Sequence, residues 1–519
     1  MSVTAVADRG IRIADALSPA EYLRIAREIR SGPQNGLRPV KVAFLSSFTF
    51  QFIEPVLVVE AARQGLRAAT YIGGFGQFEQ EVLGEAGLRA FDPDVLVIAM
   101  RPEDVDPDAI ARYHATGGRR FAELAAGMTR RVEDLIAGFR GWSRAPVAVA
   151  NYATPARLPF GICDANLGGS LTYALAAANE ALRTSVAGCP GTVVWDYAGL
   201  VHAAGTESWT DPRLWSMARG PVAPRHQPAL ARHLVRTLLA ARREPAKCLV
   251  LDLDNTLWGG VIGEDGMTGI RLGDDFPGSV YKAFQRSVLS LMDRGILLAV
   301  CSKNDPDIVD RVLRDHPEML IRPDHISASR VGWGPKSRGL REIAAELGIG
   351  SDALVLFDDN PVERAEVRAN APEVGVVEVP ADPLRYDEAL WGCGFFDQLA
   401  LSDEDLRRTA MYREEKERRV FASGFQSVDQ FLASGCETAQ YLKGEKAIEI
   451  TVGYLKERNA FGGPLWSKQG IRQRLAMRQA PDQVRVAKGG GVDGDLVGTG
   501  VEQGSGILLR RDAPTDAEG

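Results

Sequence analysis

Two aspartates that could take part in phosphoryl chemistry stand directly behind a short apolar stretch. The sequence CLVLDLDNTLWGG, residues 248–260, places Asp252 and Asp254 after a run that is typical of a buried strand. Because side chains on a strand alternate between its faces, the two carboxylates should project the same way while Leu253 packs inward. Acids beside Asn and Gly are also common in ordinary turns, so this pattern alone leaves both interpretations open.

Further polar residues recur at the ends of predicted elements later in the chain. Ser302 follows the apolar run GILLAVC, Asp358 and Asp359 follow ALVLF, and Lys336 starts the predicted helix KSRGLREIAAEL. In an open parallel sheet, ligands bind just beyond the carboxyl ends of the strands. Each of these residues alone is most often a turn or a surface residue. Four such features in this order favour one shared site that handles phosphate.

Converging carboxylates repel one another strongly unless a cation joins them. Ligands that are all oxygen, with no His or Cys, select a hard ion, and few protein ligands with water completing the shell suits Mg²⁺. A metal, a lysine and a serine hydroxyl together would form a receptor for a phosphate group. One aspartate could then attack phosphorus, and a second could protonate the leaving group.

The stretches DLDNT, VCSKND, GPKS and LFDDNP resemble the four motifs of the haloacid dehalogenase (HAD) superfamily. The longer stretches DLDNTLWGGVIGEDG and FDDNPVERAEV resemble the FkbH-like family of glyceryl transferase/phosphatases, over about residues 245–380. The resemblance implies that Asp252 is the nucleophile and Asp254 the general acid/base. It implies that Ser302 and Lys336 hold the phosphoryl group.

The same resemblance implies the metal ligands and the substrate. Mg²⁺ would be bound by Asp252, the backbone carbonyl of Asp254 and Asp358, with Asp359 behind them. The family takes glyceryl from 1,3-bisphosphoglycerate, removes phosphate and loads the acyl group onto an acyl carrier protein for polyketide extender units such as methoxymalonyl-ACP. Cys301, next to the predicted phosphate-binding serine, is a candidate acyl carrier, although strand alternation turns it away from that face.

The order of predicted elements indicates an α/β protein with three parts. Residues 1–243 alternate strands (within 40–48, 94–100, 146–152 and 192–197) with helices (55–66 and 229–243), which predicts a parallel sheet covered by helices. Residues 245–390 form a second α/β unit. Only a Gly/Asp-rich flap, residues 259–275, and one helix separate its first two strands, so we expect no large cap domain and an open site that could admit a carrier-protein arm.

The first part resembles an SGNH-hydrolase fold through LSPAEYLRIAREIR and WDYAGLVHAAGTESWTDPRLW. Hydrolysis would need a serine paired with a base. Ser46 and Ser47 follow the first strand and Asn151 could mimic an oxyanion-hole residue, but no His stands three residues after Asp211. A docking or scaffold role is therefore favoured for this part.

The third part, residues 400–519, begins with an Arg/Glu-rich helix signal and resembles a GNAT acyltransferase region. Its stretch KERNAFGG keeps only Asn459 and Phe461 of the family signature, which indicates a degenerate or truncated domain. The Gly-rich run at residues 487–506 has few large apolar residues, so we expect poor order there.

Composition limits the partners. A formal net charge of −7 lacks the positive field that nucleic acid binding requires. No apolar run approaches the ~20 residues that span a bilayer, and the N-terminus shows no apolar signal region. The six cysteines form no CxxC pair, which fits a reducing, cytoplasmic compartment rather than a disulfide or zinc protein.

Three functional hypotheses remain open at this point. The first is an Mg²⁺-dependent glyceryl transferase/phosphatase that acts with an acyl carrier protein. The second is a HAD phosphohydrolase of a small phosphorylated metabolite without acyl transfer. The third is a non-enzymatic adaptor that binds a carrier protein.

Overall fold

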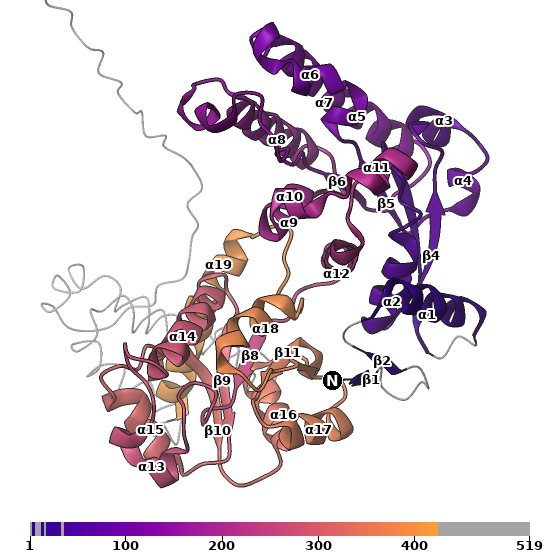
Figure 1. Cartoon of the computed structure of the whole chain (residues 1–519). Helices are drawn as coiled ribbons and strands as arrows, with labels where there is room; N and C mark the ends of the chain where they lie inside the picture. Colours follow the sequence, from indigo (N-terminus) through magenta and orange to yellow (C-terminus); the bar gives the residue numbers. More distant parts are fainter. Residues whose placement is uncertain (1–2, 6–11, 15–16, 33–35, 424–519) are drawn as a thin grey trace, which may run out of the picture. The chain divides into compact units, whose positions relative to one another are not determined.

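The computed structural model describes residues 3–5, 12–14, 17–32 and 36–423 of the 519-residue chain (Figure 1). These residues form two five-stranded sheets in which every neighbouring pair of strands is parallel. A short antiparallel pair, β1 (Val3–Ala5) with β2 (Arg12–Ala14), precedes them. The predicted α/β class with parallel sheets is confirmed. Most of the predicted third part, including Asn459 and Phe461, lies outside the described residues.

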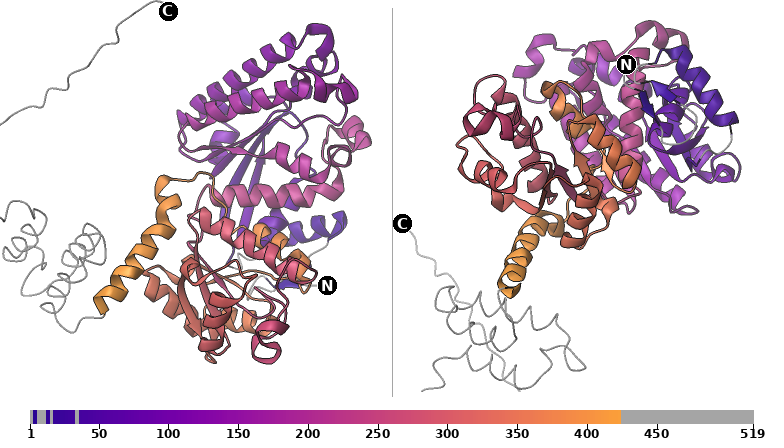
Figure 2. Two further views of the ribbon diagram at one scale, coloured as in Figure 1. Left: turned by 90° about the vertical axis from the view of Figure 1, so that its left-hand side faces the viewer. Right: turned by 90° about the horizontal axis from the view of Figure 1, so that it is seen from below.

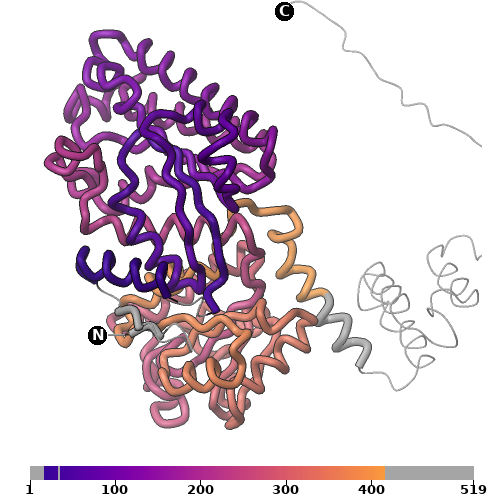
Figure 3. Tube along the Cα trace, turned by 90° about the vertical axis from the view of Figure 1, so that its right-hand side faces the viewer, coloured from indigo at the N-terminus to yellow at the C-terminus, as the bar shows by residue number. Residues whose placement is uncertain are grey.

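The first sheet has the strand order β4-β3-β5-β6-β7. Its strands are β3 (Arg38–Ser46), β4 (Leu66–Ile72), β5 (Val95–Ala99), β6 (Val147–Ala150) and β7 (Thr192–Trp195). Strands β3 and β4 pair in parallel over seven residues, and Figure 3 shows these indigo strands side by side. The four strands that the sequence analysis predicted all lie in this sheet, and β4 was not predicted.

Helices cover both faces of the first sheet (Figure 2). Alternate side chains of β3 and β5 pack against α1, α2 and α12 on one face, and against α7 and α8 on the other. This alternation is the period-2 pattern of a strand buried on both faces. The helices are α1 (Pro19–Ser31), α2 (Glu54–Arg63), α3 (Phe78–Leu83), α4 (Leu88–Phe91), α5 (Pro102–Val105), α6 (Pro107–Ala111), α7 (Arg119–Arg140), α8 (Leu171–Ala187), α9 (Tyr197–Ala204), α10 (Thr206–Trp209), α11 (Pro212–Ala218) and α12 (Gln227–Ala240).

The second sheet has the strand order β10-β9-β8-β11-β12, with β8 at its centre. Its strands are β8 (Cys248–Leu251), β9 (Leu297–Ser302), β10 (Ile326–Val331), β11 (Leu354–Phe357) and β12 (Gly375–Val376). Helices α14, α15 and α18 cover one face, and α16 and α17 cover the other (Figure 1). The order of the strands makes the carboxyl ends of β9, β8 and β11 neighbours.

The helices of this part are α13 (Ile262–Gly269), α14 (Gly278–Asp293), α15 (Pro306–Asp315), α16 (Lys336–Leu347), α17 (Pro361–Asn370) and α18 (Tyr386–Gly392), and α19 (Asp403–Ser423) follows them in the chain. The connection between β8 and β9 contains the short α13 in addition to the one predicted helix, α14. That connection is described throughout and carries no further sheet, as expected for a site without a large cap. Among the described residues, none of the helices combines the length and apolarity needed to cross a membrane.

Candidate active site

The central strand β8 positions Asp252 through its backbone. All four residues of β8 are buried, and the Asp252 amide donates a hydrogen bond to the carbonyl of Phe357 on β11 at 3.0 Å. Asp252 is itself 8% exposed. The carboxylate therefore projects from the edge of a rigid core.

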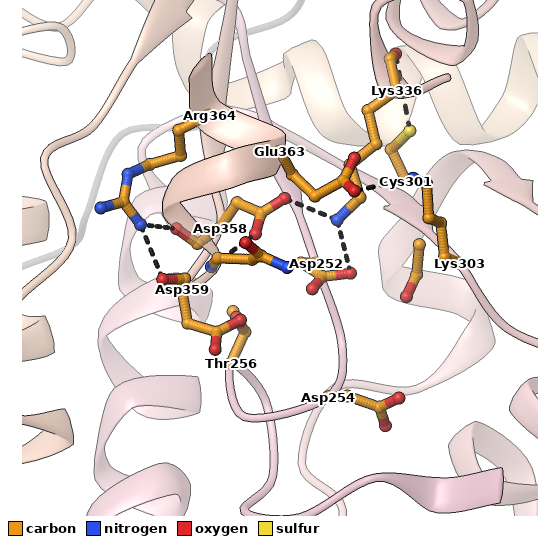
Figure 4. A network of polar contacts seen from close by, with 12 residues as sticks. Asp252, Asp254, Thr256, Cys301, Lys303, Lys336, Asp358, Asp359, Glu363 and Arg364 are labelled. Atoms are coloured by element: carbon orange, nitrogen blue, oxygen red, sulfur yellow. Dashed lines mark hydrogen bonds and ion pairs between the residues drawn. The ribbon is translucent and has the colours of Figure 1, made fainter. Parts of the chain in front are cut away.

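Three carboxylates meet at this edge of the sheet. One oxygen each of Asp252, Asp358 and Asp359 lie within 4.8 Å of one another. Figure 4 shows the three residues near one another, Asp252 directly after β8 and Asp358 and Asp359 directly after β11. Asp358 is completely buried, while Asp359 is partly exposed. A cluster of oxygen ligands with this geometry fits a hard divalent cation such as Mg²⁺.

Two of these acids, Asp358 and Asp359, have raised pKa values. Burial and the neighbouring charge of Asp252 raise the pKa of Asp358, and the Lys336 ammonium opposes this shift. Burial, followed by the charges of Asp252 and Asp358, raises the pKa of Asp359 to about 6. The protein therefore concentrates negative charge here at a cost that a bound cation would offset.

Lys336 lies between two of these acids. Its ammonium is 2.9 Å from an Asp252 oxygen and 2.5 Å from an Asp358 oxygen. Burial lowers the pKa of this lysine, but the two carboxylates outweigh that effect and the pKa is raised. Lys336 is the first residue of α16, directly after Pro335, so the helix start fixes where the side chain enters the site. The ammonium is held charged beside Asp252.

Ser302 and Asp254 are connected by a residue that the sequence analysis did not single out, Asn304. The Asn304 amide donates hydrogen bonds to Asp254 at 2.9 Å and to the Ser302 hydroxyl at 3.2 Å. The other carboxylate oxygen of Asp254 accepts from the indole of Trp258 and from the backbone of Ile262. Asn304 stands in the motif CSKND, which was the signal for it.

The carboxylate of Asp254 does not join the acidic cluster (Figure 4). The strand ends at Leu251, so the strict alternation expected for residues 252–254 does not continue, although Leu253 is buried as expected. The carboxylate of Asp254 is directed toward β9 and its loop. This position suits a proton-transferring group. Metal binding through the Asp254 carbonyl stays a prediction.

Arg364, on α17, supports the acidic segment from behind and was also not predicted. One guanidinium nitrogen donates to the backbone carbonyls of both Asp358 and Asp359 at 2.7 Å. The Asn360 amide donates to the Asp358 carboxylate, and the Asn360 side chain caps α17. These bonds fix the turn after β11. Its neighbour in the motif DDNPVER, Glu363, pairs with Lys303 at 2.7 Å.

A cavity of about 220 Å³ lies beside the acids. Ser302, Lys336, Arg330 and Arg338 are among its lining residues, and none of the three clustered acids lines it. The cavity therefore adjoins Ser302 and Lys336, the two residues that the sequence analysis predicted to bind phosphate. Arg330 forms ion pairs with Glu342 and Glu346 of α16.

Cys301 packs away from the acids, as alternation predicts. It belongs to the apolar layer under α16, and its sulfur lies 3.9 Å from the Lys336 carbonyl (Figure 4). Burial raises the pKa of the Cys301 thiol to about 12. A protonated thiol is a poor nucleophile. Cys301 is nevertheless among the residues that line the 220 Å³ cavity, and its role as an acyl carrier stays a prediction.

In the first sheet, the residues considered for ester hydrolysis have other partners. The Ser47 hydroxyl donates to Asp104 at 2.8 Å, and the Asn151 amide donates to Asp196 at 2.8 Å. Asp211 caps α11. Among the described residues, no histidine contacts the Ser47 hydroxyl.

Comparison with known proteins adds one finding to this geometry. No protein-family profile and no curated protein matches the chain. A solved structure does match: the N-terminal part of the protein BF1531 from Bacteroides fragilis, containing a phosphatase domain and complexed with Mg. The two are 26% identical with a TM-score of 0.63, over 74% of this chain and all of that one.

This chain is therefore similar in sequence and fold to a protein with a phosphatase domain. The expectation of Mg²⁺ as cofactor is confirmed by the Mg complex of that protein together with the cluster of Asp252, Asp358 and Asp359. The match does not bear on glyceryl transfer or on a carrier protein.

Proposed function

We propose that the chain is an Mg²⁺-dependent phosphatase in which Asp252 attacks phosphorus. The observation that carries this proposal is the placement of Asp252 at the end of the central strand, in contact with Lys336 and clustered with two further acids. Three carboxylates and one lysine leave a net negative charge. Such a site suits a divalent cation first and a phosphate group second.

In the first half of the reaction, a carboxylate oxygen of Asp252 forms a bond to phosphorus. The bond between phosphorus and the leaving oxygen breaks, and that oxygen takes a proton from Asp254. In the second half, Asp254 accepts a proton from water, the water oxygen bonds to phosphorus, and the Asp252–phosphorus bond breaks. The Asn304 amide and the two donors on the opposite side keep Asp254 in one orientation for both transfers.

Lys336 and Ser302 bind the phosphoryl oxygens in this proposal. The Lys336 ammonium already contacts Asp252, so it can bridge the nucleophile and the group under attack. When bound to Asp252, Asp358 and Asp359, Mg²⁺ would neutralise the acids and the developing phosphoryl charge.

The test is release of inorganic phosphate from a panel of small phosphate esters in the presence of Mg²⁺. Asp252→Asn is expected to abolish release, since an amide cannot form the aspartyl-phosphate. The matched control is Asp310→Asn, which removes an exposed carboxylate on α15, a helix that covers the second sheet. Activity that survives Asp252→Asn would exclude Asp252 as the nucleophile.

A finer form of the proposal follows from the motif resemblance. The substrate is 1,3-bisphosphoglycerate, and the phosphopantetheine thiol of an acyl carrier protein accepts the glyceryl group. The thiol sulfur bonds to the acyl carbon, the bond from that carbon to the acyl-phosphate oxygen breaks, and phosphate leaves with the proton that the thiol gives up. The ester phosphate then requires Asp252. The short connection between β8 and β9, with no added sheet, supports access for a bulky acceptor.

A phosphohydrolase that releases phosphate without acyl transfer is the second candidate, and the similarity to a solved structure that contains a phosphatase domain favours it. The protein is incubated with 1,3-bisphosphoglycerate and a carrier protein, and both proteins are weighed by mass spectrometry. A glyceryl adduct on the carrier supports transfer. Phosphate release without an adduct supports hydrolysis, and neither signal supports an adaptor role.

A further inference from the structure

A second cavity lies in the part of the protein built on the first sheet. Its volume is about 660 Å³, within the range of small-molecule sites. Arg101 and Asp104, which follow the carboxyl end of β5, contribute to its wall together with the segment that contains Trp215 and Arg219. Ligands of open parallel sheets bind at this end of the strands. No residue of the proposed phosphatase site lines this cavity.

The wall contains two buried polar atoms without a hydrogen-bond partner among the described residues. Arg101 donates through its other nitrogens to Glu103, and Asp104 accepts through its other oxygen from Ser47. The remaining atoms, Arg101 Nη1 and Asp104 Oδ1, form an ion pair with each other at 3.7 Å, but neither makes a hydrogen bond among the described residues. The Asp104 side chain is only 3% exposed. Unsatisfied atoms at such a site are costly and call for a donor and an acceptor from outside the chain.

An aromatic ring and a second cation complete the wall. The guanidinium carbons of Arg101 and Arg219 lie 5.0 Å and 5.1 Å from the centre of the Trp215 ring. The Arg219 side chain is exposed and has no salt bridge within the part of the chain that the structure describes. Phe75, 61% exposed, and three prolines add apolar surface. Glu103 also lines the cavity, so two arginines, Arg101 and Arg219, face two acids, Glu103 and Asp104. Their charges balance, which disfavours binding of a phosphate dianion.

We infer that this cavity binds a small monocarboxylate that carries a hydrogen-bond donor on the adjacent carbon and an apolar substituent, which describes a hydroxy acid or an amino acid. The carboxylate would bind Arg219 and Arg101 Nη1, the nitrogen of Arg101 that makes no hydrogen bond. The hydroxyl or ammonium group would donate to Asp104, and the apolar substituent would contact Trp215 and Phe75. Burial raises the pKa of Asp104 to about 6, so the group is an ionised acceptor above that pH.

Calorimetry on the full chain tests the inference with three probes of equal shape: 3-phenyllactate, phenylalanine and 3-phenylpropionate. The first two carry the donor, as hydroxyl and ammonium respectively, and the third lacks it. At least one of the first two is expected to bind about tenfold or more tightly than 3-phenylpropionate, because only they satisfy Asp104. Which one binds identifies the ligand as a hydroxy acid or an amino acid.

Variants separate this cavity from the phosphatase site. Arg219→Ala, at an exposed position, should weaken binding about tenfold or more. Arg213→Ala, at an exposed position on α11 outside the cavity lining, should leave binding unchanged, and so should Asp252→Asn. The inference is overturned if neither donor-bearing probe binds, if 3-phenylpropionate binds equally well, or if Arg219→Ala binds like the wild type.

Discussion

Asp359→Asn should stabilise the metal-free protein at alkaline pH while weakening Mg²⁺ binding. The pKa of Asp359 is about 6 in the folded protein against an ordinary value of 3.8. The difference of about two units corresponds to roughly 3 kcal/mol at 1.36 kcal/mol per unit. Asp359 is partly exposed, so solvent screening reduces the expected gain to about 1–2 kcal/mol.

The sign follows from proton linkage. A carboxyl whose folded pKa is raised binds protons more tightly in the folded state than in the unfolded state. The ionised form of Asp359 therefore lowers the free energy of unfolding by its full amount above about pH 6. This cost disappears as the pH falls toward 3.8. Asn resembles the neutral form, so the advantage of Asp359→Asn should be present at pH 8 and absent near pH 4.

Hydrogen exchange of the buried amides of β8 and β11 measures the local unfolding free energy at this site. The samples contain EDTA in one series and Mg²⁺ in the other, with Asp310→Asn as the control for loss of an exposed charge. In Mg²⁺ the wild type should have the higher local unfolding free energy of the two, because it keeps one more ligand for the metal. A variant that is less stable than the wild type in EDTA at pH 8 would refute the reasoning.

Three further predictions concern residues around the acids. Lys336→Met should destabilise the second sheet by about 3–5 kcal/mol at neutral pH, since it leaves two buried carboxylates unpaired; unchanged hydrogen exchange would contradict this. Asn304→Ala should lower kcat about tenfold to a hundredfold and leave Mg²⁺ affinity unchanged, because it releases Asp254 but touches no clustered acid; calorimetry with Mg²⁺ and phosphate-release rates separate the two effects. Cys301→Ala should keep phosphate release within a few-fold of the wild type, and a complete loss would show that the thiol takes part.

The sequence predicts the central part of the second sheet well, because β8, β9 and β11 are buried on both faces and appear as continuous apolar runs. The outer strand β10, with the sequence ISASRV, was not predicted, because an edge strand buries fewer side chains and lacks that signal. The same reason applies to the two-residue β12 and, in the first sheet, to β4.

At the site, residues that stand at strand ends or helix starts could be predicted from the sequence. Asp252, Ser302, Lys336 and Asp358 are of this kind. Asn304 and Arg364 were not singled out, although the motifs CSKND and DDNPVER contain them, because they act through hydrogen bonds to other site residues rather than through a position that the strand pattern marks. The orientation of a carboxylate beyond the last residue of a strand also depends on the loop.

Detection of a phosphorylated Asp252 tests the central claim most directly. Asp254→Asn should slow breakdown of the aspartyl-phosphate, since water then has no base to accept its proton. The substrate is an aryl phosphate, whose leaving group needs no proton from Asp254, so the variant slows breakdown of the intermediate more than its formation. Acid-quenched reactions of this variant with Mg²⁺ and that substrate are digested and analysed by mass spectrometry. The account predicts a phosphoryl group on the peptide that contains Asp252, and none when Asp252 is also replaced by Asn. Substrate turnover in which that peptide never carries phosphate, or label on a different residue, would contradict it.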